Sequence, residues 1–118
     1  MTLTSSKNIL IVDDDLDIRE MLKNFLGSCG FHTFTIRDVE EALRSLRKNL
    51  FDLVLTNYEM PGMTGDELVR FIKENYPYIK VWGMSFFDKR EDFYQAGADF
   101  FIKKPFELSK LRALLKTI

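Results

Sequence analysis

The sequence predicts a single α/β domain over residues 1–118, in which helices cover both faces of a parallel β-sheet. Five short runs of apolar, β-branched or aromatic residues alternate with five segments of helical periodicity. Each helical segment is long enough for the right-handed crossover that joins two parallel strands. The strands are predicted near residues 7–13, 31–36, 51–57, 79–84 and 99–102.

The helix predicted after the first strand has one apolar face. Asp15 precedes it as the N-cap, and Gly27 and Gly30 supply the signal that ends it. Its apolar residues follow the i, i+3, i+4, i+7, i+8 spacing of a buried helix face. These residues are Ile18, Met21, Leu22, Phe25 and Leu26.

Asp38 and Thr64 are predicted to begin the second and third helices. Glu41 and Glu67 follow them at the three-residue spacing of a capping box. Pro77 closes the third helix. The two apolar faces consist of Val39, Ala42, Leu43 and Leu46, and of Leu68, Val69 and Ile72.

The last two helices differ in how clearly their apolar periodicity predicts them. The fourth, near residues 88–96, is short and weakly periodic. The fifth runs from about residue 107 to residue 116 and places Leu108, Leu111, Leu114 and Leu115 on one face. In open sheets built this way, the reactive site forms outside the carboxyl ends of the strands.

The composition favours a cytoplasmic protein that contacts neither membrane nor nucleic acid. The 17 basic residues are balanced by 18 acidic ones, so no broad basic surface is expected. The longest apolar run, residues 9–12, is far shorter than the roughly 20 residues of a membrane span, and residues 1–6 lack the features of a signal peptide. Cys29 and His32 have no partner at metal-binding spacing and are predicted to be structural.

Polar side chains gather where the predicted strands end. The first strand is followed by Asp13, Asp14 and Asp15, the third ends in Thr56 and Asn57, the fourth is followed by Ser85, and the fifth by Lys103 and Lys104. Carboxylates are suited to a small divalent cation, and a hydroxyl and an ammonium group are suited to phosphoryl oxygens. The sequence therefore predicts a site that handles phosphoryl groups.

Three motifs resemble those of the receiver domain of two-component response regulators. They are Ile9-Leu-Ile-Val-Asp-Asp-Asp15, Met60-Pro-Gly-Met-Thr-Gly65 and Gly97-Ala-Asp-Phe-Phe-Ile-Lys-Lys-Pro-Phe106, and the resemblance covers essentially the whole chain. It implies a flavodoxin-like, doubly wound sheet of order 2-1-3-4-5 and a phosphorelay signalling domain that is not an enzyme in the usual sense. It also implies a histidine kinase or phosphotransfer protein upstream and an effector domain or protein downstream.

The resemblance also implies roles for the residues at the strand ends. Ser85 and Lys104 match the hydroxyl and the ammonium group that gather the phosphoryl oxygens. Phe101 matches an aromatic residue that turns inward on phosphorylation, although it is equally consistent with plain core. The implied Mg²⁺ ligands are Asp13, Asp14, Asn57 and the backbone carbonyl of Glu59.

Asn57 departs from the family pattern, because the resemblance implies an aspartate as phosphoacceptor at this position. A neutral amide oxygen is a poor nucleophile, so Asn57 is not expected to accept a phosphoryl group. The cation site also loses one charge, so Mg²⁺ is expected to bind more weakly. Two accounts remain open: a substitution, engineered or selected, that holds a competent receiver unphosphorylated, or a natural degenerate receiver that signals by binding alone.

A second departure lies between Ser85 and Gly97, where the chain is shorter than the family pattern by about one helical turn (~3–4 residues). We therefore expect a short fourth helix. Phe86 stands where the family usually has a small residue. Its ring is expected either to shield the edge of the site or to face solvent as an anchor for a partner.

Two rival functions follow from other interpretations of the same residues. One is a protein-interaction module that works independently of phosphorylation and binds through the face of the short helix. The other is a small flavodoxin-like enzyme, which the three aspartates after the first strand disfavour because they would repel a cofactor phosphate. Simpler assignments make Asp15 only an N-cap, Lys103 a solvated charge and Trp82 a core residue.

Overall fold

The computed structural model describes residues 7–118, and the leader Met1 to Ser6 lies outside this range. Its five strands form one parallel sheet of order β2-β1-β3-β4-β5, which confirms the predicted topology. The strands are β1 (Asn8–Val12), β2 (His32–Ile36), β3 (Leu53–Asn57), β4 (Lys80–Ser85) and β5 (Phe100–Lys103). The helices are α1 (Leu16–Ser28), α2 (Val39–Lys48), α3 (Gly65–Asn75), α4 (Arg90–Ala96) and α5 (Leu108–Leu115).

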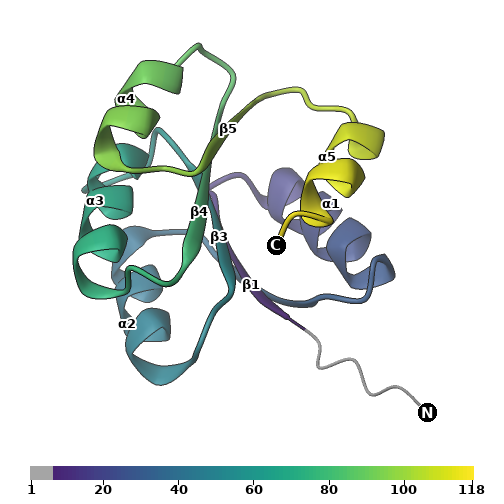
Figure 1. Ribbon diagram of the computed structural model, residues 1–118, viewed down its shortest axis with the longest axis horizontal. Helices are drawn as coiled ribbons and strands as arrows, with labels where there is room; N and C mark the ends of the chain where they lie inside the picture. Colours follow the sequence, from purple (N-terminus) through teal and green to yellow (C-terminus); the bar gives the residue numbers. More distant parts are fainter. Residues whose placement is uncertain (1–6) are drawn as a thin grey trace.

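Helices cover both faces of the sheet, with α2, α3 and α4 on one side and α1 and α5 on the other (Figure 1). The side chains of β1 alternate between two cores: Leu10 and Val12 belong to the first, and Ile9 and Ile11 to the second. All four are fully buried, as expected for a strand covered on both faces. No helix within residues 7–118 has the length and apolarity to cross a membrane.

The predicted caps begin their helices. Asp15 accepts hydrogen bonds from the backbone N–H groups of Asp17 and Ile18, at 2.8 and 3.3 Å. The Asp38 carboxylate accepts one from Glu41 N–H at 2.9 Å. At the start of α3, Glu67 reaches back and accepts from both the N–H and the hydroxyl of Thr64. These two hydrogen bonds lower the pKa of Glu67.

A few expected boundaries and contacts were wrong. The strand ends differ from the predicted ones by one or two residues; Phe51, for example, is buried but precedes the point where β3 pairs with β1. Leu108 is 40% exposed, contrary to the predicted face of the fifth helix. It lies in the first turn of α5, whereas Leu111 and Leu115 further along reach the core.

The short fourth helix is confirmed, since α4 has seven residues. Its one large buried side chain, Phe93, lies flat against β4 at Gly83. A Cβ atom on Gly83 would overlap the ring of Phe93. The absence of a side chain at this strand position therefore allows α4 to pack closely on the sheet.

Replacing Gly83 with alanine is expected to lower the free energy of unfolding by about 1–3 kcal/mol, because the buried ring of Phe93 must move. Gly27→Ala is the matched control, since a Cβ there meets nothing within 4 Å and the residue is helical. That change is expected to raise stability by about 0.5–1 kcal/mol. Urea unfolding measures both, and equal effects of the two substitutions would contradict this packing account.

Candidate functional site

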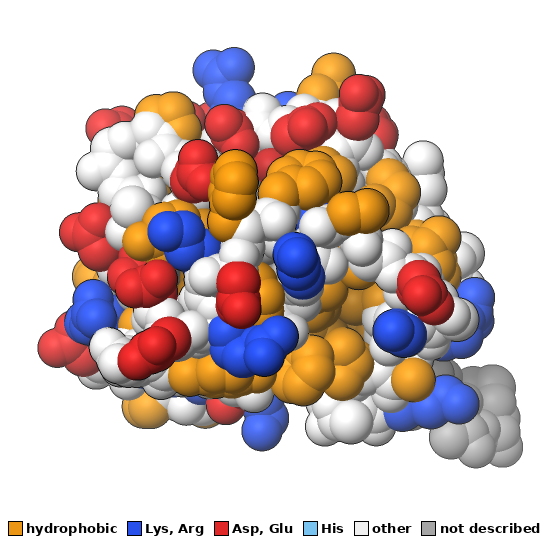
Figure 2. Space-filling model, turned by 90° about the horizontal axis from the view of Figure 1, so that it is seen from above, with side chains coloured by type: hydrophobic (Ala, Val, Ile, Leu, Met, Phe, Trp, Pro, Cys, Tyr) orange, Lys and Arg blue, Asp and Glu red, His pale blue; other side chains and the backbone are white. Residues whose placement is uncertain are grey.

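The carboxyl ends of the strands surround a hollow of about 220 Å³, called here the carboxyl-edge hollow. Figure 2 looks onto this edge of the molecule, where acidic and hydrophobic side chains lie side by side. The loops after β1, β3, β4 and β5 all contribute to it, as the parallel topology requires. Its lining consists of Asp13, Asp14, Asp15, Asn57, Glu59, Ser85, Phe86, Phe87 and Lys104.

A buried ion pair forms the floor of this hollow. Lys104 Nζ lies 2.6 Å from Asp13 Oδ2, and the two side chains are 2% and 0% exposed. Burial raises the pKa of Asp13 above its ordinary value, although the hydrogen bond from Lys104 and the N–H of Asp15 act in the opposite direction. Each buried charge therefore depends on the other for its stability.

The Asn57 side chain lies at the end of β3 beside this ion pair. Its Oδ1 accepts a hydrogen bond from Lys104 Nζ at 3.0 Å. Its Nδ2 donates to the backbone carbonyl of Glu59 at 2.8 Å and, more weakly, to Asp14 Oδ1 at 3.4 Å. The carboxamide of Asn57, at the end of β3, thus connects the loop after β1, the β3–α3 loop and the chain after β5.

Ser85 and the two phenylalanines after it form another wall of the hollow. Ser85 is 2% exposed, and its hydroxyl accepts a hydrogen bond from the N–H of Phe87 at 3.0 Å. The ring centroid of Phe86 lies 5.3 Å from Lys104 Nζ, within cation–π range. Phe86 and Phe87 remain 54% and 63% exposed, so Phe86 both covers the lysine and faces solvent.

A protein-family profile matches nearly the whole of this chain. The profile of the response regulator receiver domain matches residues 9–116. The chain belongs to this family. It is therefore the receiver domain of a two-component response regulator, a signalling protein and not an enzyme in the usual sense.

Relatives of this receiver domain differ in overall length. Chemotaxis protein CheY-3 of Vibrio cholerae is 37% identical over 122 residues, which cover 98% of this chain and 94% of CheY-3. Response regulator protein PilR of Pseudomonas aeruginosa is 37% identical over 116 residues, which cover 96% of this chain. The match spans 26% of PilR.

Solved structures share the fold over nearly the full length. Chemotaxis response regulator CheY4 of Vibrio cholerae matches with a TM-score of 0.89 at 28% identity, covering 96% of this chain and 98% of CheY4. Response regulator TrrA from Thermotoga maritima, in complex with Mg²⁺ and BeF, matches with a TM-score of 0.87 at 33% identity. That match covers 94% of this chain and 97% of TrrA.

Several of the expected Mg²⁺ ligands already make hydrogen bonds within the hollow. Both Asp13 oxygens already accept hydrogen bonds, from Lys104 and from the N–H of Asp15. The Glu59 carbonyl, an expected ligand, accepts from Asn57 Nδ2, so Asn57 presents a donor where a metal requires an oxygen. Within residues 7–118, no group of three or more His, Cys, Asp or Glu residues is placed to hold a metal ion.

Phe101 points inward in this receiver domain. It is 6% exposed, and its ring centroid lies 5.8 Å from that of Phe93, which in turn lies 5.7 Å from Tyr58. Its backbone N–H donates to the hydroxyl of Tyr94 at 3.1 Å. An aromatic series therefore connects the residue after Asn57 with β5 and α4.

Two residues near the hollow were missed from the sequence. Arg19 Nη1 donates to the backbone carbonyl of Asp13 at 2.7 Å, and no spacing rule marks this contact. Gly65 packs against the end of β3, where a Cβ atom would overlap the carbonyl oxygen of Asn57. The signal available for Gly65 was a glycine in the first turn of a helix, a position at which glycine is otherwise costly.

The remaining residues singled out in the sequence lie away from the hollow. Thr56 is fully buried, and its hydroxyl donates to the carbonyl of Asn57 at 3.0 Å. Trp82 is buried in the core and Lys103 is exposed, both as predicted. Cys29 is free and partly buried, and His32 is exposed beside the ring of Phe34.

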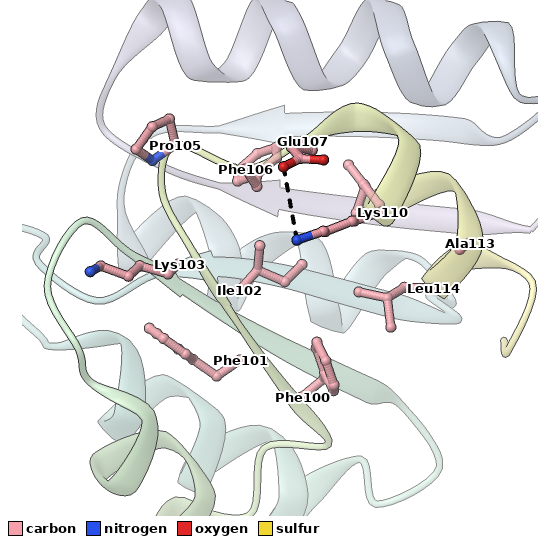
Figure 3. A pocket seen from close by; sticks show the side chains of 11 residues that line it. Phe100, Phe101, Ile102, Lys103, Pro105, Phe106, Glu107, Lys110, Ala113 and Leu114 are labelled. Atoms are coloured by element: carbon pink, nitrogen blue, oxygen red, sulfur yellow. Dashed lines mark ion pairs between the residues drawn. The ribbon is translucent and has the colours of Figure 1, made fainter.

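A larger hollow of about 550 Å³, called here the β5–α5 groove, lies at the edge of the sheet (Figure 3). Phe100, Ile102 and Leu114 surround it, and Phe101 points to the other side of β5 (Figure 3). The charged pair at its rim, Glu107 and Lys110, is 3.8 Å apart. The groove is thus mainly apolar, with none of the converging polar groups of the carboxyl-edge hollow.

Replacing Lys104 with methionine is expected to lower the free energy of unfolding at neutral pH by about 3–5 kcal/mol, because Asp13 stays buried without its counter-charge. The loss should shrink at acid pH. The folded chain holds the Asp13 proton more tightly than the unfolded chain, so stability falls as pH rises through the raised pKa of Asp13. Urea unfolding at neutral and acid pH measures the effect.

Lys103→Met is the matched control, because this neighbouring lysine is exposed. Its substitution is expected to change stability by less than about 0.5 kcal/mol at either pH. Equal losses for the two lysine variants, or a Lys104→Met loss independent of pH, would contradict the importance assigned to the ion pair.

Proposed function

We propose that Asn57 occupies the phosphoacceptor position of this receiver domain, and that the chain does not accept a phosphoryl group there. The observation that carries this proposal is the contact of Asn57 Oδ1 with Lys104 Nζ, at 3.0 Å, in the carboxyl-edge hollow. An aspartate in the same place would direct a charged oxygen at phosphorus. The carboxamide oxygen is neutral, and its nitrogen lone pair is delocalised into the carbonyl.

The other residues of the hollow are suited to phosphoryl handling. Lys104 and Ser85 are the ammonium and hydroxyl groups proposed to gather phosphoryl oxygens. Asp13, Asp14 and the Glu59 carbonyl are proposed as the oxygen ligands of Mg²⁺ in a competent site. With Asn57 donating to two of these three residues, Mg²⁺ is proposed to bind weakly.

The proposed partners are those of two-component signalling: a histidine kinase or phosphotransfer protein upstream and an effector domain or protein downstream. The cytoplasm is the proposed location. Both relatives named above support a signalling assignment, CheY-3 at nearly the length of this chain and PilR as a longer protein. If this receiver domain resembles CheY-3 in length, its effector is a separate protein; if it belongs to a longer chain such as PilR, its effector is another domain of that chain.

Two accounts of Asn57 follow. In the first, the substitution holds an otherwise competent receiver in its unphosphorylated state; the presence of Asp13, Ser85 and Lys104 supports it. In the second, the chain is a natural degenerate receiver. The seven-residue α4 and the large ring of Phe86 support the second account.

A second candidate function is a protein-interaction module that is independent of phosphorylation. The apolar β5–α5 groove and the exposed rings of Phe86 and Phe87 favour it, since exposed apolar surface commonly marks a protein contact. In this function the domain holds one conformation, with Phe101 turned inward. Signalling then depends on binding alone.

Incubation with Mg²⁺ and acetyl phosphate tests the proposal. The native chain is expected to gain no phosphoryl group, because Asn57 lacks a nucleophilic oxygen. Asn57→Asp is expected to gain one, detected by intact-protein mass spectrometry as an adduct that alkali removes. An alkali-labile phosphoryl adduct on the native chain would contradict the proposal.

The same experiment separates the two accounts of Asn57. Phosphorylation of Asn57→Asp together with a shift in the amide spectrum would support the competent receiver held unphosphorylated. A variant that takes no phosphoryl group, with its fold intact, would support the degenerate receiver and the interaction module. Asn57→Ala serves as the control that has neither carboxylate nor carboxamide.

A further inference from the structure

The orientation of the Asn57 carboxamide follows from the charges around it. Its oxygen faces the Lys104 ammonium at 3.0 Å, and its nitrogen faces two oxygens, Glu59 O at 2.8 Å and Asp14 Oδ1 at 3.4 Å. The reversed orientation would direct an NH₂ group at an ammonium and an oxygen at two acceptors. The electrostatics of the hollow therefore select the observed orientation.

A carboxylate in the place of Asn57 would meet a different balance of charge. Three carboxylates would then surround the single ammonium of Lys104, and the oxygen nearest Glu59 O would face an acceptor with no proton between them. Like charges this close destabilise the folded state unless a cation lies among them. The NH₂ group of Asn57 supplies positively polarised hydrogens at that point instead.

The Asn57 carboxamide also holds the loop that leads into α3. Its hydrogen bond to Glu59 O fixes the chain two residues on, and the N–H of Gly65 donates to Tyr58 O at 2.6 Å. Gly65 sits directly against the carbonyl of Asn57. Contacts of Asn57 and its neighbour Tyr58 thus secure both ends of the β3–α3 connection.

We propose that the NH₂ group of Asn57 takes over the bridging role of a divalent cation, so that the carboxyl-edge hollow is complete without metal. This inference rests on the proposed function, in which Asn57 stands at the position of a carboxylate. The bridge joins the loop after β1, through Asp14, to the loop after β3, through Glu59. The stability of the native fold then depends little on Mg²⁺.

Urea unfolding with excess Mg²⁺ and with a chelator tests this inference. The unfolding midpoint of the native chain is expected to differ little between the two conditions. Asn57→Asp is expected to unfold at lower urea than the native chain with chelator, and Mg²⁺ should raise its midpoint. Asn57→Ala is expected to unfold at lower urea than the native chain under both conditions, since it has neither bridge nor cation ligand.

Asn75→Ala is the matched control, because its amide donates one hydrogen bond, to Phe71 O on α3, and is exposed. Its midpoint should lie closer to that of the native chain than the midpoint of Asn57→Ala. A native midpoint that rises with Mg²⁺ as much as that of Asn57→Asp would overturn the inference. So would an Asn57→Ala midpoint equal to that of Asn75→Ala.

These outcomes are distinct from the test of the proposed function. Phosphorylation of the native chain would overturn the proposed function. The unfolding midpoints are a separate measurement, which that result does not decide. A native midpoint that Mg²⁺ raises strongly would overturn the bridging inference even in a chain that takes no phosphoryl group. The comparison of the native chain with Mg²⁺ and with chelator requires no substitution. It therefore still tests the inference if a variant fails to fold.

Discussion

The buried ion pair between Lys104 and Asp13 is the constraint on which the carboxyl edge depends. The two residues are 91 positions apart in the chain, and β3 and β4 lie between their strands in the sheet. Neither charge is accessible to water, so each is stable only while the other is in place. The contact therefore fixes how the end of β5 meets the end of β1, and every other group of the hollow is placed around it.

Asn57 acts on this edge in two ways that have one chemical cause. A carboxamide has an acceptor and a donor, whereas a carboxylate has acceptors alone. Its oxygen shares the Lys104 ammonium with Asp13, and its NH₂ group joins Asp14 to Glu59. In the proposed account, the same substitution that removes the nucleophile also completes the hydrogen bonds of the site, which makes the unphosphorylated, metal-free arrangement a stable end state.

The fold was largely predictable because it depends on local signals. Periodic apolar residues and the caps Asp15 and Asp38 gave the elements and their order. Hydrogen-bond partners of polar side chains were not predictable in this way, because they depend on contacts between distant segments. Neither the amide orientation of Asn57 nor the contact of Arg19 with Asp13 O has a signature in residue spacing, and the exposure of Leu108 depends on where α5 meets the sheet.

The side-chain amide protons of Asn57 offer the most direct test of the central claim. In a ¹⁵N-resolved NMR spectrum of the metal-free protein, the account predicts that both Asn57 Nδ2 proton resonances are displaced from the positions of exposed asparagine amides, because each proton is hydrogen-bonded to its own acceptor. It further predicts that these resonances keep their positions when Mg²⁺ is added. Resonances that shift in a saturable manner at low Mg²⁺ concentration would show that the cation binds beside the amide, and would contradict the account.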